Sequence, residues 1–192
     1  MPGTLSAPLI VGLGGTTRPD SSTARALATA LEAAASAGAA TRTFDGQHLA
    51  LLPIYSPELA ERCPQAIELV EAIREADGLI IASPGYHGGV SGMVKNALDY
   101  LEDLREDERP YLTGRAIGCI ACAAGWQATV STLGALRAIV HALRGWPTPM
   151  GAAINSASKD PEATDGATFQ LRTLGTEVAH FARPRPAHAV AS

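Results

Sequence analysis

Continuous apolar runs that alternate with helical patterns constrain the fold of this chain more than any other feature of its sequence. Three runs, LIVGL, LIIA and AIGCIA, lack the polar residue at every second position that a half-exposed strand carries. Uninterrupted apolar strands are typical of a parallel sheet that helices cover on both faces. The five predicted strands are Pro8–Leu13, Thr41–Phe44, Gly78–Ala82, Ala116–Ala121 and Gly151–Ile154.

Helical patterns fill the intervals between these strands. They are predicted at Ser22–Ala37, Pro64–Glu75, Gly92–Leu104 and Trp126–Leu143, with a last helix near Glu162–Phe181. Alternating strands and helices imply right-handed crossovers. The predicted fold class is therefore an α/β, flavodoxin-like three-layer sandwich, with helices on both faces of a five-stranded parallel sheet in the order 2-1-3-4-5. We expect a single domain over residues 1–183 and a Pro-rich, disordered tail over residues 184–192.

The charge balance and the hydropathy pattern exclude several functional classes. The 192 residues include 15 Lys and Arg against 19 Asp and Glu, whereas a nucleic-acid surface needs clustered basic residues. No apolar run approaches the roughly 18 residues of a membrane span. The first residues, MPGTLSAPLIVGLGG, have no basic residue ahead of the apolar run, unlike a signal peptide. We therefore expect a cytoplasmic protein that binds neither nucleic acid nor membranes.

Two of the three cysteines, Cys119 and Cys122, form a CxxC pattern. Such a pair is found in redox and zinc sites. Here it lies within a predicted strand, where residues three apart point to opposite faces, and no second Cys or His pair lies nearby. The sequence therefore predicts two structural thiols and no metal site.

The loop after the first strand has the composition of a phosphate site. Residues 14–23, GGTTRPDSST, carry five hydroxyl side chains and one arginine, and they lead into a helix whose free N–H groups attract anions. The alternative is a simple helix cap at Ser22 or Thr23. The loop is not a Walker motif, because no lysine follows, and it lacks the third glycine of GxGxxG. Asp45 lies too far along the chain for a ribose-binding acid and is interpreted as a solvated strand end.

The loops after the third and fourth strands are predicted to border a flat, mostly uncharged slot. In SPGYHGGVSG, three glycines let the backbone approach a ligand closely, and Tyr86 and His87 add planar side chains. A turn before the next helix is the alternative. Gly125 and Trp126 follow the fourth strand, where Trp126 either closes the slot or packs beneath the loop. No GxSxG nucleophile motif is present.

These loops resemble those of the NAD(P)H-dependent FMN reductase family of the flavodoxin-like superfamily. GGTTRPDSST is similar to the family's GS-x-R-x-x-S-x-[NST] loop, and SPGYHGGVSGMVKNALDY is similar to SPEYNGSIPGxLKNALDW. HLALLPIYSPEL is similar to an L-x-LPLYDxDL segment, so the resemblance spans most of residues 9–104. The chain departs from the family at Gly85 and His87, where Glu and Asn are commoner.

The resemblance implies bound FMN and hydride transfer from NADPH or NADH. Because this chemistry belongs to the cofactors, it implies no catalytic residue of the protein. The phosphate of FMN would be held by Thr16, Arg18, Ser21, Ser22 and Thr23. The ribityl chain and ring would be bordered by Pro84, Gly85, Tyr86, His87, Gly88, Ala124, Gly125 and Trp126.

The electron acceptor is left open by the sequence. The resemblance favours a ping-pong FMN reductase that supplies reduced flavin to a partner monooxygenase. The alternatives are a quinone, azo or metal-oxyanion reductase with tightly bound FMN, a flavodoxin-type electron carrier, and a non-enzymatic module for another phosphate ligand.

The predicted helix at residues 92–104 gives a reason to expect a homodimer or a dimer of dimers. Its two neighbouring apolar stripes cover a wider arc than one sheet contacts, and the family commonly dimerises through this region. Cover from another helix, or from the loop after the second strand, is the alternative. The stripes are Val94, Leu98 and Leu101, and Met93, Ala97, Tyr100 and Leu104.

Overall fold

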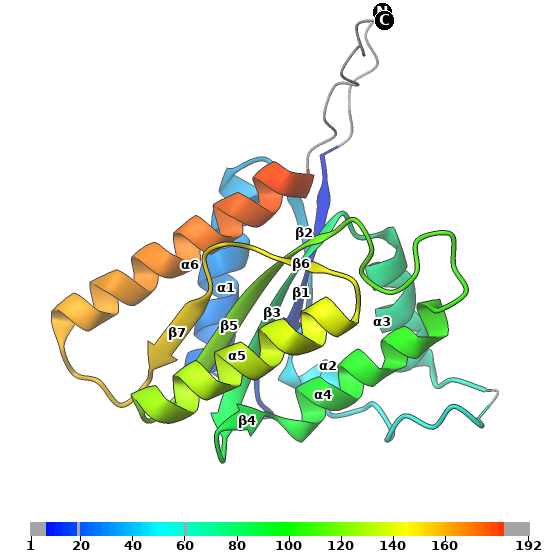
Figure 1. Cartoon of the computed structure of the whole chain (residues 1–192), viewed down its shortest axis with the longest axis horizontal. Coiled ribbons are helices and arrows are strands. Elements are labelled where there is room, and N and C mark those ends of the chain that lie inside the picture. Colours follow the sequence, from blue (N-terminus) through cyan, green and yellow to red (C-terminus); the bar gives the residue numbers. More distant parts are fainter. Residues whose placement is uncertain (1–6, 19, 60, 183–192) are drawn as a thin grey trace, which may run out of the picture.

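The computed structural model describes residues 7–18, 20–59 and 61–182, so the predicted tail lies outside the described residues. All five predicted strands are present and parallel, and they pair side by side in the order β2-β1-β3-β5-β7 (Figure 1). The flavodoxin-like class is confirmed. The bounds are β1 Leu9–Gly14, β2 Ala40–Phe44, β3 Gly78–Tyr86, β5 Ala116–Ala123 and β7 Ala152–Asn155.

Two short strands extend the sheet from five strands to seven. β4 (Gly89–Val90) pairs antiparallel with β3, and β6 (Trp146–Pro147) pairs with the first residues of β5. Both are two residues long, which is too short for periodicity to reveal. β4 matters for function because it lies in the loop expected to border the ligand.

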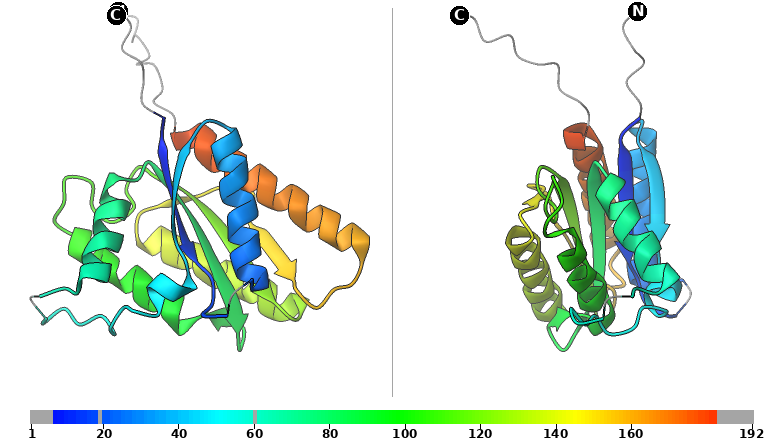
Figure 2. Two further views of the ribbon diagram at one scale, coloured as in Figure 1. Left: turned by 180° about the vertical axis from the view of Figure 1, so that it is seen from behind. Right: turned by 90° about the vertical axis from the view of Figure 1, so that its right-hand side faces the viewer.

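The helices form one layer on each face of the sheet (Figure 2). One layer consists of α1 (Ser22–Ser36) and α6 (Pro161–Ala182). The other contains α3 (Pro64–Glu75), α4 (Gly92–Asp99) and α5 (Trp126–Ala142). The 3₁₀-helix η1 (Tyr100–Leu104) continues α4, and the short α2 (Gly46–Leu49) follows β2. Among the described residues, no helix is both long enough and apolar enough to cross a membrane.

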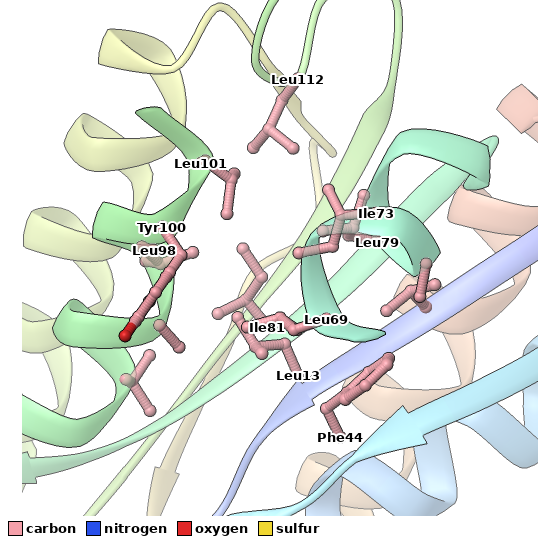
Figure 3. Close-up of a cluster of buried hydrophobic side chains, with 14 of the residues drawn as sticks. Leu13, Phe44, Leu69, Ile73, Leu79, Ile81, Leu98, Tyr100, Leu101 and Leu112 are labelled. Carbon is pink, nitrogen blue, oxygen red and sulfur yellow. The ribbon is translucent and has the colours of Figure 1, made fainter. Parts of the chain in front are cut away.

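Each face of the sheet has its own apolar core. Figure 3 shows part of the core beneath α3 and α4, where Leu69 and Leu98 approach Ile81 of β3. Cys119 belongs to this core and Cys122 to the core beneath α1 and α6, so the two thiols point to opposite faces as predicted. Burial raises the pKa of Cys119 to about 12 and that of Cys122 to about 11. Both thiols therefore stay protonated at neutral pH. The described ranges contain no cluster of three or more potential metal ligands.

The second apolar stripe of the α4 region is covered by the chain itself. Tyr100 and Leu104 are almost fully buried. The loop after β2 lies on this surface. The ring of Tyr55 packs edge-on against that of Tyr100, with 5.2 Å between the ring centroids. The main-chain N–H of Tyr55 donates to the side-chain oxygen of Asn96 at 2.8 Å. The alternative of cover from the loop after the second strand is therefore correct, and this stripe gives no reason to expect a dimer.

Candidate functional site

The three predicted ligand loops lie together at one edge of the sheet. β1, β3 and β5 are adjacent parallel strands, with Gly14 beside Ala82 and Pro84 beside Cys122 in the register. The carboxyl ends of adjacent parallel strands meet at the same edge, where ligands bind in open α/β sheets. The fold therefore brings together the segments that the sequence singled out.

The first loop begins with two glycines, which lie close to the backbone of β3. Gly14 has φ +139°, and a Cβ built there would lie 1.9 Å from the backbone oxygen of Ala82. Gly15 has φ +114°, and its N–H donates to the same oxygen at 3.3 Å. Positive φ and this close approach both require glycine. The loop backbone is thus fixed before any side chain takes part.

The start of α2 packs against the first loop. A Cβ on Gly46 would lie 2.0 Å from the backbone oxygen of Thr16, and the side-chain amide of Gln47 donates to Thr17 O at 2.6 Å. Asp45 is the N-cap of α2 and accepts from the N–H of Gln47 at 3.0 Å. Asp45 is an exposed residue at the end of β2, as interpreted, and the structure adds its role as a helix cap. Sequence reasoning missed this support, although Asp-Gly after a strand is a recognisable start of a helix.

Ser21 is the N-cap of α1, whereas the alternative considered for this loop was a cap at Ser22 or Thr23. Its hydroxyl accepts from the N–H of Ala24 at 3.2 Å, and the residue is only 2 % exposed. Thr23 is also buried, and a hydrogen bond joins its hydroxyl to the thiol of Cys122. These two hydroxyls are therefore engaged within the protein. A ligand would meet this turn through its free main-chain N–H groups.

Three side chains of the predicted phosphate set remain accessible. Thr16 and Ser22 are half-buried, and Arg18 is exposed. The hydroxyl of Thr16 accepts from the N–H of Arg18 at 3.2 Å, which closes a small turn. Arg18 adds a positive charge to the loop that leads into α1, and the N-terminus of that helix carries a partial positive charge of its own.

The SPGYHGGVSG segment contains a tight hairpin. β3 runs on to Tyr86, and Tyr86 pairs with Gly89 of β4. His87 and Gly88 form the turn with φ +54° and +79°, typical of a two-residue hairpin. Among non-glycine residues, Asn, Asp and His tolerate this left-handed conformation best. The backbone therefore accounts for His87 at a position where Asn is commoner in the family.

The hairpin packs closely on the first turns of α5. A Cβ on Gly85 would lie 2.7 Å from the hydroxyl of Thr132 and 3.0 Å from the Cβ of Ala123. The hydroxyl of Ser131 donates to Gly88 O at 2.9 Å. A glutamate at position 85 does not fit this packing. Gly85 is thus explained by the close approach of α5, a contact that the sequence alone does not reveal.

The aromatic side chains of the site are exposed. Tyr86 is 59 % exposed and Trp126 is 55 % exposed, so Trp126 does not pack beneath its loop. Trp126 begins α5, directly after Ala124 and Gly125, and Gly125 O accepts from the N–H of Thr129. Planar side chains from the segments after β3 and β5 therefore lie at the same edge of the sheet as the turn before α1.

Comparisons with known proteins agree with this arrangement. A model of the family described as NADPH-dependent FMN reductase matches residues 8–182. An FMN-dependent NADPH-azoreductase of Staphylococcus haemolyticus (strain JCSC1435) is 31 % identical over 122 residues, 61 % of each chain. An NADPH azoreductase of Bacillus sp. (strain OY1-2) is 30 % identical over 88 residues, 45 % of this chain and 46 % of the relative.

A likeness in structure extends over nearly the whole chain. An oxidoreductase from Corynebacterium diphtheriae superposes with a TM-score of 0.77 and 20 % identity, covering 92 % of this chain and 97 % of that chain. At this identity the likeness concerns the fold alone. The sequence matches to the two azoreductases span 46 % and 61 % of those relatives' lengths.

Proposed function

Because this chain belongs to the NADPH-dependent FMN reductase family, we propose that it binds FMN at the three loops and reduces it with NADPH or NADH. One observation carries the proposal. A glycine-lined turn at the N-terminus of α1 lies at the same sheet edge as the hairpin and the exposed Trp126. This arrangement suits a ligand with a phosphate at one end and a flat ring at the other.

The residues of the first loop fit a phosphate. Gly14 leaves no room for a side chain between the loop and β3, so the main chain itself lines the turn. The first N–H groups of a helix have no partner within it, and here they belong to Ser22 and its neighbours. Arg18 adds a guanidinium, which binds phosphate through charge-assisted hydrogen bonds.

The hairpin and the start of α5 would hold the ring end. When bound, FMN supplies the capacity to accept and pass on a hydride. Pro84 and Gly85 border the slot with buried or half-buried main chain, whereas Tyr86 and Trp126 offer planar faces that exclude water. The protein thus contributes anchoring and orientation, and we assign it no acid or base.

Several acceptors remain within the proposal. Our first candidate is free flavin, passed in reduced form to a partner monooxygenase. Reduction of an azo compound is the second candidate, because two relatives are named azoreductases. A quinone or a metal oxyanion would use the same exposed slot. A flavodoxin-type carrier that does not react with nicotinamide is disfavoured by the family match. We propose a cytosolic location, since the three cysteines are free thiols and disulfides form in oxidising compartments.

The test of this function is an FMN titration followed by NADPH and NADH oxidation. We expect a yellow complex that oxidises at least one of the two. Arg18→Ala should weaken FMN binding by about ten- to a hundredfold, the value of a charged hydrogen bond. Arg42→Ala, at an exposed arginine paired with Glu68, is the matched control and should leave the affinity unchanged. Unchanged thermal stability with FMN, together with no consumption of either nucleotide, would refute the function.

We also propose a homodimer, now on the basis of α5. The exposed face of this helix carries no charged residue along Val130, Gly134 and Ala138. Surface helices are normally polar on the side away from the core. An uncharged exposed face with small residues suits close packing against the same helix of a second copy, because such interfaces are self-complementary.

The dimer proposal predicts that Val130→Glu dissociates the assembly. A carboxylate in the middle of an apolar interface is left desolvated, which should raise the dimer dissociation constant by a hundredfold or more. Light scattering after gel filtration measures this directly. Ala28→Glu, at an exposed position of α1, is the control. A monomeric wild-type protein would end the proposal, and so would a Val130→Glu variant that stays dimeric.

A further inference from the structure

The hairpin formed by β3 and β4 is held by hydrogen bonds at its base and at its tip. At the base, the buried hydroxyl of Ser83 accepts from the N–H of Ser91 at 3.0 Å and donates to Pro84 O at 2.9 Å. At the tip, Gly88 O accepts from the hydroxyl of Ser131 on α5 at 2.9 Å. Figure 1 shows the hairpin at the lower end of the sheet, beside the start of α4. The turn between the two strands therefore has a defined place at the edge of the proposed flavin site.

The two sides of β3 face different layers of helices. Ala82 belongs to the core beneath α1 and α6. Gly85 faces α5, since a Cβ there would lie 2.7 Å from the hydroxyl of Thr132. Side chains alternate along a strand, so Tyr86, which is 59 % exposed, lies on the side of Ala82 and α1. Because the proposed phosphate loop leads into α1, a flavin whose phosphate lies at that loop can place its ring against Tyr86.

His87 follows Tyr86 and is the first residue of the turn, with φ +54°. The residue is exposed, and consecutive Cα atoms lie about 3.8 Å apart. Exposed charges interact over roughly 8 Å at physiological ionic strength. A ring against Tyr86 is therefore within reach of a charge on His87, whether or not the two are in contact. Histidine is the side chain whose charge ordinarily changes between about pH 5 and 8.

Few charged groups surround His87 on the segments that pack around it. Residues 78–94 and 126–136, which form the hairpin, the start of α4 and the first turns of α5, contain no carboxylate. The first charged residues on α4, Lys95 and Asp99, pair with each other, and Arg137 on α5 donates to Thr148 O. The other titratable or charged side chains on β3, β5, α5, the first loop and the start of α1 are Tyr86, Cys119, Cys122, His141, Arg18, Asp20 and Arg25. A positive charge on His87 is therefore not neutralised by the hairpin or by the first turns of α5.

We propose that His87 makes the redox equilibrium of the proposed flavin site depend on pH. This inference rests on the proposed function, because it concerns the ring that the site would hold. Transfer of a hydride from nicotinamide C4 to flavin N5 breaks a C–H bond, forms an N–H bond and gives the ring one negative charge, while the donor becomes a cation. Protonated His87 places a positive charge near this ring and favours its reduced form, and His87 itself keeps its proton. The preference increases as the pH falls and is lost as the pH rises, because only the protonated imidazole is charged.

The test is the reduction potential of the protein at saturating FMN, measured from about pH 5.5 to about pH 8.5 by equilibration with a reference dye. His87→Asn removes the titrating group, and Asn tolerates the left-handed turn. At the acid end we expect the wild type to prefer reduced over oxidised flavin about tenfold more strongly than this variant, a difference of about 30 mV. The two proteins should coincide at the alkaline end. The pH dependence of the flavin itself is common to both and cancels in the difference.

Two further variants separate the charge of His87 from the shape of the turn. His87→Gly removes the side chain but keeps the turn, because Gly adopts positive φ without strain. Its potential should match that of His87→Asn at every pH. His141→Asn is the matched control, because it exchanges an exposed histidine near the C-terminus of α5 for the same amide. Its potential should follow that of the wild type throughout.

The outcomes that overturn the inference differ from those that overturn the function. A wild-type protein that takes up no FMN loses the proposed function, and this inference with it. A protein that binds FMN and oxidises NADPH, but whose potential has the same pH profile with and without His87, loses this inference alone. A difference between the wild type and the two His87 variants that is equal at every pH also overturns it, because a titrating charge would not be its cause.

Discussion

Gly46→Ala is expected to weaken FMN binding by roughly ten- to a hundredfold, because displacing the first loop removes charge-assisted hydrogen bonds to the phosphate. The added Cβ would lie 2.0 Å from the oxygen and 2.3 Å from the carbon of the Thr16 backbone. Both atoms belong to the main chain, so no side chain can rotate away. The first loop itself must shift, and with it the hydroxyl of Thr16 and the turn that orients Arg18.

The control for this substitution is Gly92→Ala. Gly92 follows the N-cap Ser91 as Gly46 follows the N-cap Asp45, so both glycines begin a helix. Nothing lies within 4 Å of a Cβ on Gly92. FMN titrations of the two variants, with melting temperatures measured alongside, isolate the contact with Thr16. Equal affinity in both variants would remove the first loop from the FMN site.

The strands and the three ligand loops were predictable because their signals are local. A continuous apolar run shows that both faces of a strand are covered, and its end shows where a loop begins. The position of GGTTRPDSST after β1 then follows, because carboxyl ends of parallel strands share an edge. Local signals do not show whether Trp126 closes the slot or packs beneath its loop. The exposure of a side chain at the start of a helix depends on which distant segments pack nearby.

The support from α2 was not predictable, because it joins residues far apart in the sequence. Gly46 and Thr16 meet only once β1 and β2 are paired. The cover of Tyr100 by the loop after β2 has the same origin. A wide apolar surface on one helix shows that something covers it, but the pattern does not show whether this is the same chain or a second copy.

The hairpin at His87 has a local sequence signal. The segment of the family that resembles this one reads Asn-Gly at the corresponding position, and Asn-Gly is the strongest short-range sign of a two-residue hairpin. Here His87 and Gly88 adopt the positive φ values that this turn needs. The departure from the family is thus conservative for the backbone, although it exchanges an amide for an imidazole.

Gly175→Ala is expected to destabilise the protein by about 3 kcal/mol, at the upper end of the usual cost of overpacking. The added Cβ would lie 2.0 Å from the oxygen and 3.0 Å from the carbon of the Ala30 backbone, and 3.1 Å from the Cβ of Ala33. Two helix backbones meet here without an intervening side chain. α1 and α6 must therefore move apart, which loosens the core that they share with β3 and β5.

Gly166→Ala on the same helix should instead stabilise the protein. Nothing lies within 4 Å of a Cβ at Gly166, so alanine gains helix propensity, about 0.5–1 kcal/mol, without a clash. Urea unfolding of both variants measures the difference, and a shift of about 10 °C in Tm should accompany Gly175→Ala. Equal stability of the two variants would contradict the tight crossing. The crossing also bears on the proposed site, because the loop proposed to hold the phosphate of FMN leads into α1.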